Sequence, residues 1–317
     1  MMRRLSSLLR SLFAIEPFRF TTWETVFLRL IFAWLLIDSI PTAAGIYPGT
    51  PHPRGLAHLM DLSFMHDPDT VRWLSISATL TLIIGALGIA EPVSLGWTLC
   101  VICFSKSYNL SQGALGHAGQ LHTLGLLAWW LASLWALRGG WKKCLWAGPD
   151  SWSLQVWGII QTIAASYTVS AITKLINSDG TWPFRGSNFV LQMMKAQDER
   201  ITSNGVRAGD FAYQMVDILS QHAWLACVLL FSAWCLEFFA FLALLNRRMC
   251  LLIGLGLLSF HHSTELLMTI GFGTHRQLLW LFLVNPLFWI ITIILAQRGG
   301  GSAVTNRVSL SNVLERR

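Results

Sequence analysis

Several ionisable side chains lie within or beside strongly apolar stretches of the sequence. Lys174 ends an apolar stretch just before the turn SDGTW, which closes with Trp182, and His117 and His122 open the stretch GHAGQLHTLGLLAWW. Lysine and histidine are among the side chains that transfer protons in enzymes. An ionisable group inside a membrane is costly to place, so it is by default a functional-site hypothesis. These residues therefore predict a polar site, equipped for acid–base chemistry, inside an apolar protein.

Further candidates lie closer to the C-terminus. The stretch LSFHHSTELLMTIGFG contains His261, His262 and Glu265, and Glu237 lies in the preceding stretch CLEFFAFLALL. On a helix, Glu265 shares a face with His261, four residues earlier, or with His262, three residues earlier. Adjacent helical residues point about 100° apart, so the two histidines do not readily bind one metal ion. The chain also lacks an HExxH sequence, and no metal site is predicted.

Each candidate also has a purely structural interpretation. The Lys174 ammonium could reach the outer lipid headgroups along its own aliphatic stem. His117 could lie in a loop, and His122 and Glu265 could form hydrogen bonds that join packed helices. Glu237 could be an ion-pair partner without a role in catalysis. The sequence leaves these alternatives open.

The composition identifies the setting of these residues. Of the 317 residues, 54% are hydrophobic and only 12% are charged, whereas soluble domains carry about 25% charged residues. Sixteen tryptophans also suit a membrane interface. Apolar runs of about 20 residues, without the alternation of barrel strands, predict an all-α polytopic membrane protein, a bundle of about eight transmembrane helices. The expected spans are residues 24–46, 72–90, 93–110, 119–137, 152–177, 222–245, 249–270 and 277–296.

Basic residues fall at the ends of alternate spans rather than in one cluster, so no nucleic-acid partner is expected. By the positive-inside rule, both termini face the cytoplasm, and the expected location is the inner membrane of a bacterium. Residues 1–20 are expected to form an interfacial amphipathic segment, residues 21–297 the transmembrane domain, and residues 298–317 a flexible cytoplasmic tail. The outer loops are then 47–71 and 178–221, the second with short interfacial helices.

Three segments of the sequence resemble one known family. They are GHAGQLHTLGLLAWWLASL, in which a histidine opens a helix; SYTVSAITKLINSDGTW, with a tyrosine, a lysine–leucine pair and a tryptophan; and SFHHSTELLMTIGF, with a phenylalanine–histidine pair followed by isoleucine–glycine. Their order, together with Glu237, resembles the membrane domain shared by vitamin K-dependent gamma-glutamyl carboxylases and their bacterial relatives, the horizontally transferred transmembrane domain family. The resemblance covers roughly residues 20–296.

The resemblance implies a mechanism and a cofactor. In the carboxylases, the lysine that matches Lys174 is the base that deprotonates reduced vitamin K. Burial would disfavour the ammonium form of Lys174 and make a neutral amine available at about pH 7. By motif, His117 and His261 are the matching histidines. With Lys174 as the base, we expect His117, His261 and Glu265 to act as supporting groups. Reduced vitamin K or another quinol would be the cofactor, bound by His122, Trp182 and Glu237.

Two departures separate the chain from the carboxylases. No large extra-membrane domain for a propeptide is expected after the last span, and the turn after Lys174 reads LINSDGTW rather than an acidic pattern. We therefore expect an enzyme that uses a quinol-type cofactor at the outer membrane face, with membrane lipid and a protein or peptide substrate as partners. The alternative is a non-catalytic assembly or maturation subunit that binds another membrane or secreted protein. A transporter ranks last, because no paired broken-helix repeats are seen.

Overall fold

The structure of the protein is a computed structural model that describes residues 12–49, 54–113, 119–139, 145, 148–204, 210–268 and 270–298. Every regular element in these ranges is a helix, and none is a strand. The predicted all-α fold class is therefore confirmed. The chain forms two compact units, residues 1–284 and residues 285–317.

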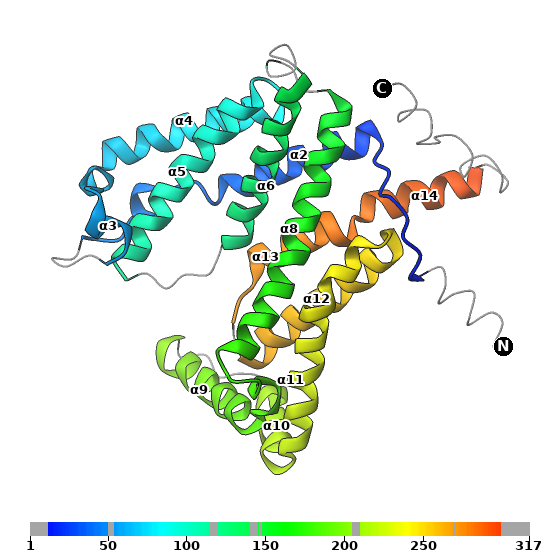
Figure 1. The fold of residues 1–317 in the computed structure, drawn as a ribbon. Coiled ribbons are helices and arrows are strands. Elements are labelled where there is room, and N and C mark those ends of the chain that lie inside the picture. The colour runs from blue at the N-terminus through cyan, green and yellow to red at the C-terminus, as the bar shows by residue number, and fades with distance from the viewer. Residues whose placement is uncertain are drawn as a thin grey trace. The chain divides into compact units, whose positions relative to one another are not determined.

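The described part of the first half of the larger unit contains four long helices joined by short helical turns (Figure 1). The long helices are α2 (Thr22–Ile37), α4 (Pro68–Ala86), α5 (Glu91–Ser111) and α6 (Gln120–Ala136). The short elements are η1 (Ala43–Gly45), α3 (Leu56–Leu59), η2 (Ser63–His66) and η3 (Leu137–Gly139).

The second half of the larger unit is built on α8 (Pro149–Ile176), α11 (Ala223–Phe238) and α12 (Arg247–Met268), and α11 packs against both of the others. Two further helices, α9 (Gly186–Asn204) and α10 (Asp210–Gln221), pack on α11 (Figure 1). The remaining elements of this half are η4 (Trp182–Phe184), η5 (Phe239–Leu244), α13 (Gly273–Leu278) and the π-helical η6 (Leu279–Val284). The smaller unit contains α14 (Pro286–Arg298).

Local sequence signals explain where several of these helices begin. Thr21 and Glu24 form a capping box at the start of α2, with the Glu24 backbone N–H donating to Thr21 Oγ1 over 3.2 Å. Asp67 caps α4 by accepting hydrogen bonds from the backbone N–H groups of Asp69 and Thr70. These side chains satisfy N–H groups that have no partner inside the helix. Both caps are local to the sequence, although the hydropathy windows put the two starts a few residues later, at 24 and 72.

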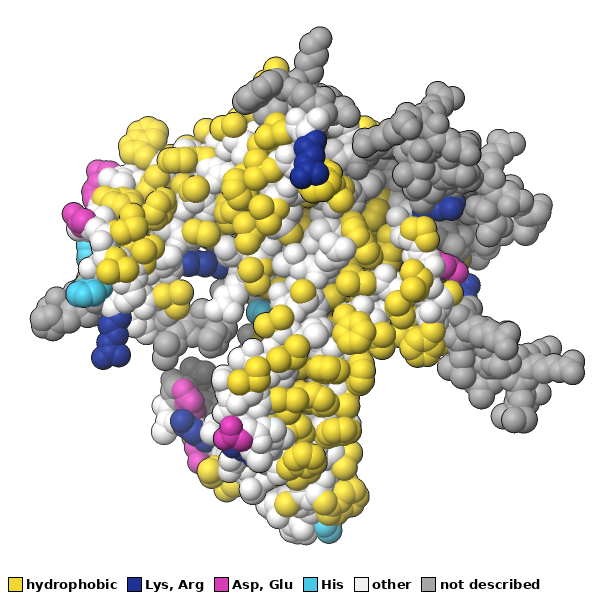
Figure 2. Space-filling view, in the orientation of Figure 1, with side chains coloured by type: hydrophobic (Ala, Val, Ile, Leu, Met, Phe, Trp, Pro, Cys, Tyr) yellow, Lys and Arg dark blue, Asp and Glu magenta, His cyan; other side chains and the backbone are white. Residues whose placement is uncertain are grey.

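Four helical segments of the described chain are long and apolar enough to cross a membrane. They are Ser151–Ile176, Ala223–Leu244, Arg247–Met268 and Gly273–Ile294, and they overlap the last four predicted spans. Large hydrophobic side chains are also exposed on the earlier helices, where Trp34 and Trp73 are 67% and 70% exposed. Hydrophobic side chains cover much of the face seen in Figure 2. A broad apolar surface of this kind is typical of a membrane-embedded protein.

Two predicted spans differ from the helices observed. The first, predicted at 24–46, is a helix of only 16 residues, because the chain reaches Pro41 soon after its C-cap and proline cannot continue a helix. The last, predicted at 277–296, is divided between η6 and α14. Asn285 separates them with a positive φ of 44°, and Pro286 has no N–H to donate. Both departures arise from backbone chemistry that a hydropathy window does not register.

The N-terminal segment differs from the predicted interfacial helix in the part that can be seen. Residues 1–11 lie outside the described residues, and residues 14–20 are not helical. The Asn246 side chain donates hydrogen bonds to the carbonyl oxygens of Leu12 and Ala14, over 2.7 and 2.8 Å. The segment is therefore held without helical structure against the turn between η5 and α12.

The two predicted outer loops contain helices, and each contributes to a small buried cluster shared with a neighbouring long helix. Residues 47–71 include α3 and η2, and residues 178–221 include α9 and α10, the short helices expected there. Met193 of α9, Leu219 of α10 and Ala226 of α11 belong to one buried cluster. The predicted flexible tail lies outside the described residues beyond position 298.

The core of the larger unit is centred on aromatic side chains from three different elements. Phe32 of α2 packs on Trp129 of α6, with ring centroids 5.7 Å apart, and edge-on against Phe282 of η6, at 5.3 Å. All three side chains are almost completely buried. Aromatic pairs of this geometry add to the stabilisation from burial, so they join the two halves of this unit.

A buried polar network also joins the helices. Arg29 of α2 and Glu91 of α5 form an ion pair, and each side chain is 1% exposed. Arg29 also donates to the carbonyl oxygen of Gly85 over 3.0 Å. Gln155 of α8 donates to Glu91 and accepts a hydrogen bond of 2.9 Å from Trp129. A buried charge is tolerated only when it is paired and hydrogen-bonded, so the network fixes the mutual arrangement of these helices.

Candidate functional site

A cavity of about 450 Å³ lies among α6, α8, α11, α12 and α13. Its ionisable and phenolic lining residues are Tyr167, Lys174, Glu237, His261 and His275. Its apolar wall is formed by Leu121, Leu124, Phe260 and Phe272. The cavity therefore combines proton-exchanging groups with aromatic and aliphatic surface.

Lys174 and Glu237 form an ion pair at this cavity. Lys174 comes from the last turn of α8 and is 28% exposed, whereas Glu237, near the end of α11, is 5% exposed. The Trp182 ring, in η4, lies 4.9 Å from the Lys174 ammonium, within the range of a cation–π interaction. The structure thus brings together three of the residues that the sequence singled out.

A second polar pair lies beside the first. The Tyr167 hydroxyl and His261 Nε2 are 2.6 Å apart. Tyr167 precedes Lys174 by seven residues on α8, about two helical turns, so both side chains are on one face. The His261 ring packs against Phe272, with ring centroids 4.5 Å apart. Its Nδ1 is buried and has no hydrogen-bond partner among the described residues.

The charges of the Lys174–Glu237 pair compensate each other, so the pair adds no net charge to the cavity. A buried carboxylate is tolerated when it is paired in this way, and Glu237 is the more buried partner. The pair therefore places an amine group and a carboxyl group side by side at the cavity.

Glu265, predicted as a supporting group, does not line this cavity. It is 41% exposed and forms an ion pair with Arg276 of α13. Arg276 also donates a hydrogen bond of 2.9 Å to His262 Nδ1. The helical spacing allowed Glu265 to pair with His261. In the structure, Glu265 pairs with Arg276 instead, and His261 Nε2 forms its hydrogen bond with Tyr167.

Of the two predicted histidines near the start of α6, His122 is described and lies away from the cavity. His122 is buried against Phe32 and does not line it, and its Nδ1 is 3.0 Å from the Ser39 hydroxyl. This is the helix-joining role weighed as its structural alternative. His117 lies outside the described residues.

Some lining residues were not singled out as candidates from the sequence. Tyr167 had a signal, because it lies two turns before Lys174 in the same motif. His275 and Phe272 had none. The rings of His261 and His275 are 5.8 Å apart, a contact that depends on how α13 returns toward α12.

Comparisons of the chain with protein-family models, curated proteins and solved structures find no match. The resemblance to the carboxylase membrane domain therefore stays a prediction from short motifs. No group of three or more His, Cys, Asp or Glu side chains in the described ranges could hold a metal ion. The geometry of the cavity is the basis for a functional interpretation.

Proposed function

We propose that the chain is an integral membrane enzyme whose Lys174 cavity binds a lipophilic quinol-type molecule and accepts a proton from it. The observation that carries the proposal is the Lys174–Glu237 pair facing the same cavity as an aromatic and aliphatic wall. The cavity volume of about 450 Å³ is within the usual range of small-molecule sites, about 300–1,000 Å³. The sequence resemblance points to the same class of ligand.

The lining residues fit an aromatic ring that carries hydroxyl groups. Phe260, Phe272 and Leu124 offer apolar contact to a ring. His261 Nδ1, which is buried and has no partner in the described part of the chain, can pair with a ring oxygen, since buried polar atoms are normally hydrogen-bonded. A bound quinol would supply a dissociable hydroxyl and reducing electrons.

Each polar residue of the cavity has a separate role in the proposed proton transfer. In the proposed step, the proton that Lys174 and Glu237 share in their ion pair moves to the Glu237 carboxylate, which leaves Lys174 Nζ as an amine. Lys174 Nζ then takes up the proton of the quinol hydroxyl, and the resulting ammonium is stabilised by the Trp182 ring, 4.9 Å away. Tyr167 fixes the His261 ring through Nε2 and so orients Nδ1.

The proposed setting is a bundle of about eight spans in the inner membrane of a bacterium. The support is the distribution of basic residues at the ends of alternate spans, which by the positive-inside rule puts both termini in the cytoplasm. The proposed cavity would then open toward the outer face.

The proposal is tested by mass spectrometry of an organic extract from the purified protein. The wild type is compared with Lys174→Ala and with Lys195→Ala, the same change at an exposed lysine of α9. We expect a quinone or related lipid in stoichiometric amount in the wild type and in Lys195→Ala, and a depleted amount in Lys174→Ala. Bulk phospholipid alone in all three samples would refute the quinol assignment and favour the assembly subunit.

A second variant separates a base from a merely positive charge. Lys174→Arg keeps the ion pair with Glu237, but a guanidinium does not release its proton at neutral pH. We therefore expect Lys174→Arg to retain the extracted lipid and to lose turnover of it. Full turnover in Lys174→Arg would show that Lys174 is not the base.

A further inference from the structure

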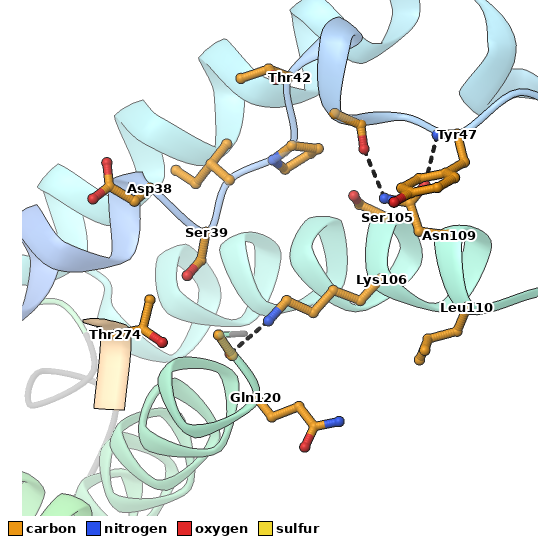
Figure 3. A pocket seen from close by; sticks show the side chains of 14 residues that line it. Asp38, Ser39, Thr42, Tyr47, Ser105, Lys106, Asn109, Leu110, Gln120 and Thr274 are labelled. Carbon is orange, nitrogen blue, oxygen red and sulfur yellow. Dashed lines mark hydrogen bonds between the residues drawn. The ribbon is translucent and has the colours of Figure 1, made fainter. Parts of the chain in front are cut away.

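A second cavity, of about 380 Å³, lies between the C-terminal end of α2, the end of α5 and the start of α6 (Figure 3). The cation in its lining is Lys106 of α5, whose Nζ donates a hydrogen bond of 2.6 Å to the carbonyl oxygen of Gly119. None of the ion pairs found within the described ranges includes Lys106. One carbonyl dipole compensates a full charge only in part, so a partly buried ammonium of this kind favours an anion.

The backbone at Gly119 leaves room for the Lys106 ammonium to lie against it. Gly119 has a positive φ of 77°, and a Cβ atom there would lie 2.9 Å from Lys106 Nζ and 3.6 Å from Ser39 Oγ. Residues with a Cβ rarely adopt such a φ, and a side chain would push the ammonium away. Glycine at position 119 therefore allows Lys106 Nζ and Ser39 Oγ to lie beside the same backbone atom.

A buried histidine makes the Ser39 hydroxyl available as a donor. His122 Nδ1 is 3.0 Å from Ser39 Oγ, and His122 Nε2 is buried without a hydrogen-bond partner among the described residues. A buried N–H without a partner is rarer than an unpaired acceptor, so the favoured tautomer carries its proton on Nδ1. Nδ1 then donates to Ser39 Oγ, and the Ser39 O–H is free to donate in turn.

We propose that this cavity binds one oxyanion group, a phosphate or a carboxylate, with Lys106 as its charge partner and Ser39 as a hydrogen-bond donor. Figure 3 shows the Asp38 carboxylate, the negative charge in the lining, turned away from the Lys106 ammonium. A charge-assisted hydrogen bond from an ammonium to an oxyanion is stronger than a hydrogen bond between neutral groups. Two sources carry this chemistry: a soluble anion and the headgroup of an anionic phospholipid. The site is separate from the Lys174 pair and does not depend on the proposed quinol chemistry, although Gln120 lines both cavities.

The test uses the full-length protein and two probes. Inorganic phosphate is titrated into the protein in an uncharged detergent by isothermal titration calorimetry. Phosphatidylglycerol is offered in nanodiscs of phosphatidylcholine, and retained lipid is counted by native mass spectrometry. The variants are Lys106→Met, Lys106→Arg, Ser39→Ala and, as the matched control, Lys195→Met at an exposed lysine.

We expect one saturable site in the wild type and in Lys195→Met. Lys106→Met should raise the dissociation constant at least about tenfold, the loss expected for a charge-assisted hydrogen bond, and Lys106→Arg should largely keep the affinity. Ser39→Ala should give a smaller loss. Phosphate binding identifies a soluble anion as the source, and selective retention of phosphatidylglycerol identifies a headgroup. The proposal is overturned if the wild type shows no saturable binding of either probe, or if Lys106→Met binds as Lys195→Met does.

Discussion

The Glu91→Gln substitution is the sharpest test of how the helices are held together. Arg29 and Glu91 are each 1% exposed, so water cannot solvate the Arg29 guanidinium once the Glu91 charge is removed. Removing one partner of a buried ion pair costs about 3–5 kcal/mol. The Arg29 guanidinium keeps its hydrogen bond to Gly85 and a ring contact of 4.6 Å with Trp152, and each contributes about 0.5–2 kcal/mol. We therefore expect a loss near the lower end of that range, about 3 kcal/mol.

The measurement is equilibrium unfolding in mixed micelles with increasing dodecyl sulfate, followed by tryptophan fluorescence. Glutamine at position 91 keeps the size of the side chain and an acceptor for Gln155, so the lost charge dominates the change. The double variant Arg29→Met/Glu91→Gln also removes the uncompensated cation. It should be more stable than Glu91→Gln by about 1–3 kcal/mol. Glu16→Gln, at an exposed carboxylate, serves as the control and should change stability by less than about 0.5 kcal/mol.

The comparison of Glu91→Gln with the double variant tests whether the unpaired Arg29 charge causes the loss of stability. If Arg29→Met/Glu91→Gln is as unstable as Glu91→Gln or less stable, then the stranded Arg29 charge is not the cause of the loss. If Glu91→Gln costs less than about 1 kcal/mol, water or another group reaches the pair, and the network does not fix the helices.

Two further predictions concern helix contact and acid stability. A Cβ at Gly254 would lie 2.8 Å from Leu283 Cβ, whereas at Gly158 the nearest atom is 3.7 Å away. Gly254→Ala should therefore cost about 1–3 kcal/mol in the same unfolding assay, while Gly158→Ala should be neutral or stabilising; equal effects would refute the close contact. The hydrogen bond from the Thr70 hydroxyl holds the pKa of Asp67 below its ordinary value of 3.8. This contribution is complete above pH 3.8 and is lost as the pH falls through the depressed pKa. The melting temperature of Asp67→Asn should therefore fall less steeply on acidification than that of the wild type, and parallel curves would contradict the assignment.

The sequence by itself determined the features that depend on neighbours along the chain. The apolar runs predicted the long helices of the described ranges, and the last four expected spans overlap segments that are long and apolar enough to cross a membrane. The capping box of α2 and the Asp67 cap of α4 could be found in the same way. Lys174 and Trp182 meet because a helix end and a short turn bring residues eight positions apart together.

Only the tertiary structure decided which distant groups meet. Lys174 pairs with Glu237, which lies 63 residues later, and not with Glu265, although both carboxylates were candidates. Tyr167 meets His261 across 94 residues. Such pairs depend on the rotation of α8, α11 and α12 about their own axes. That rotation is fixed by contacts between the helices, such as the hydrogen bond of 3.1 Å from the Trp234 indole of α11 to the carbonyl oxygen of Ala171 of α8, because one arrangement of the core fills its space and pairs its buried charges. Hydropathy and spacing describe each helix alone, so they do not contain this information.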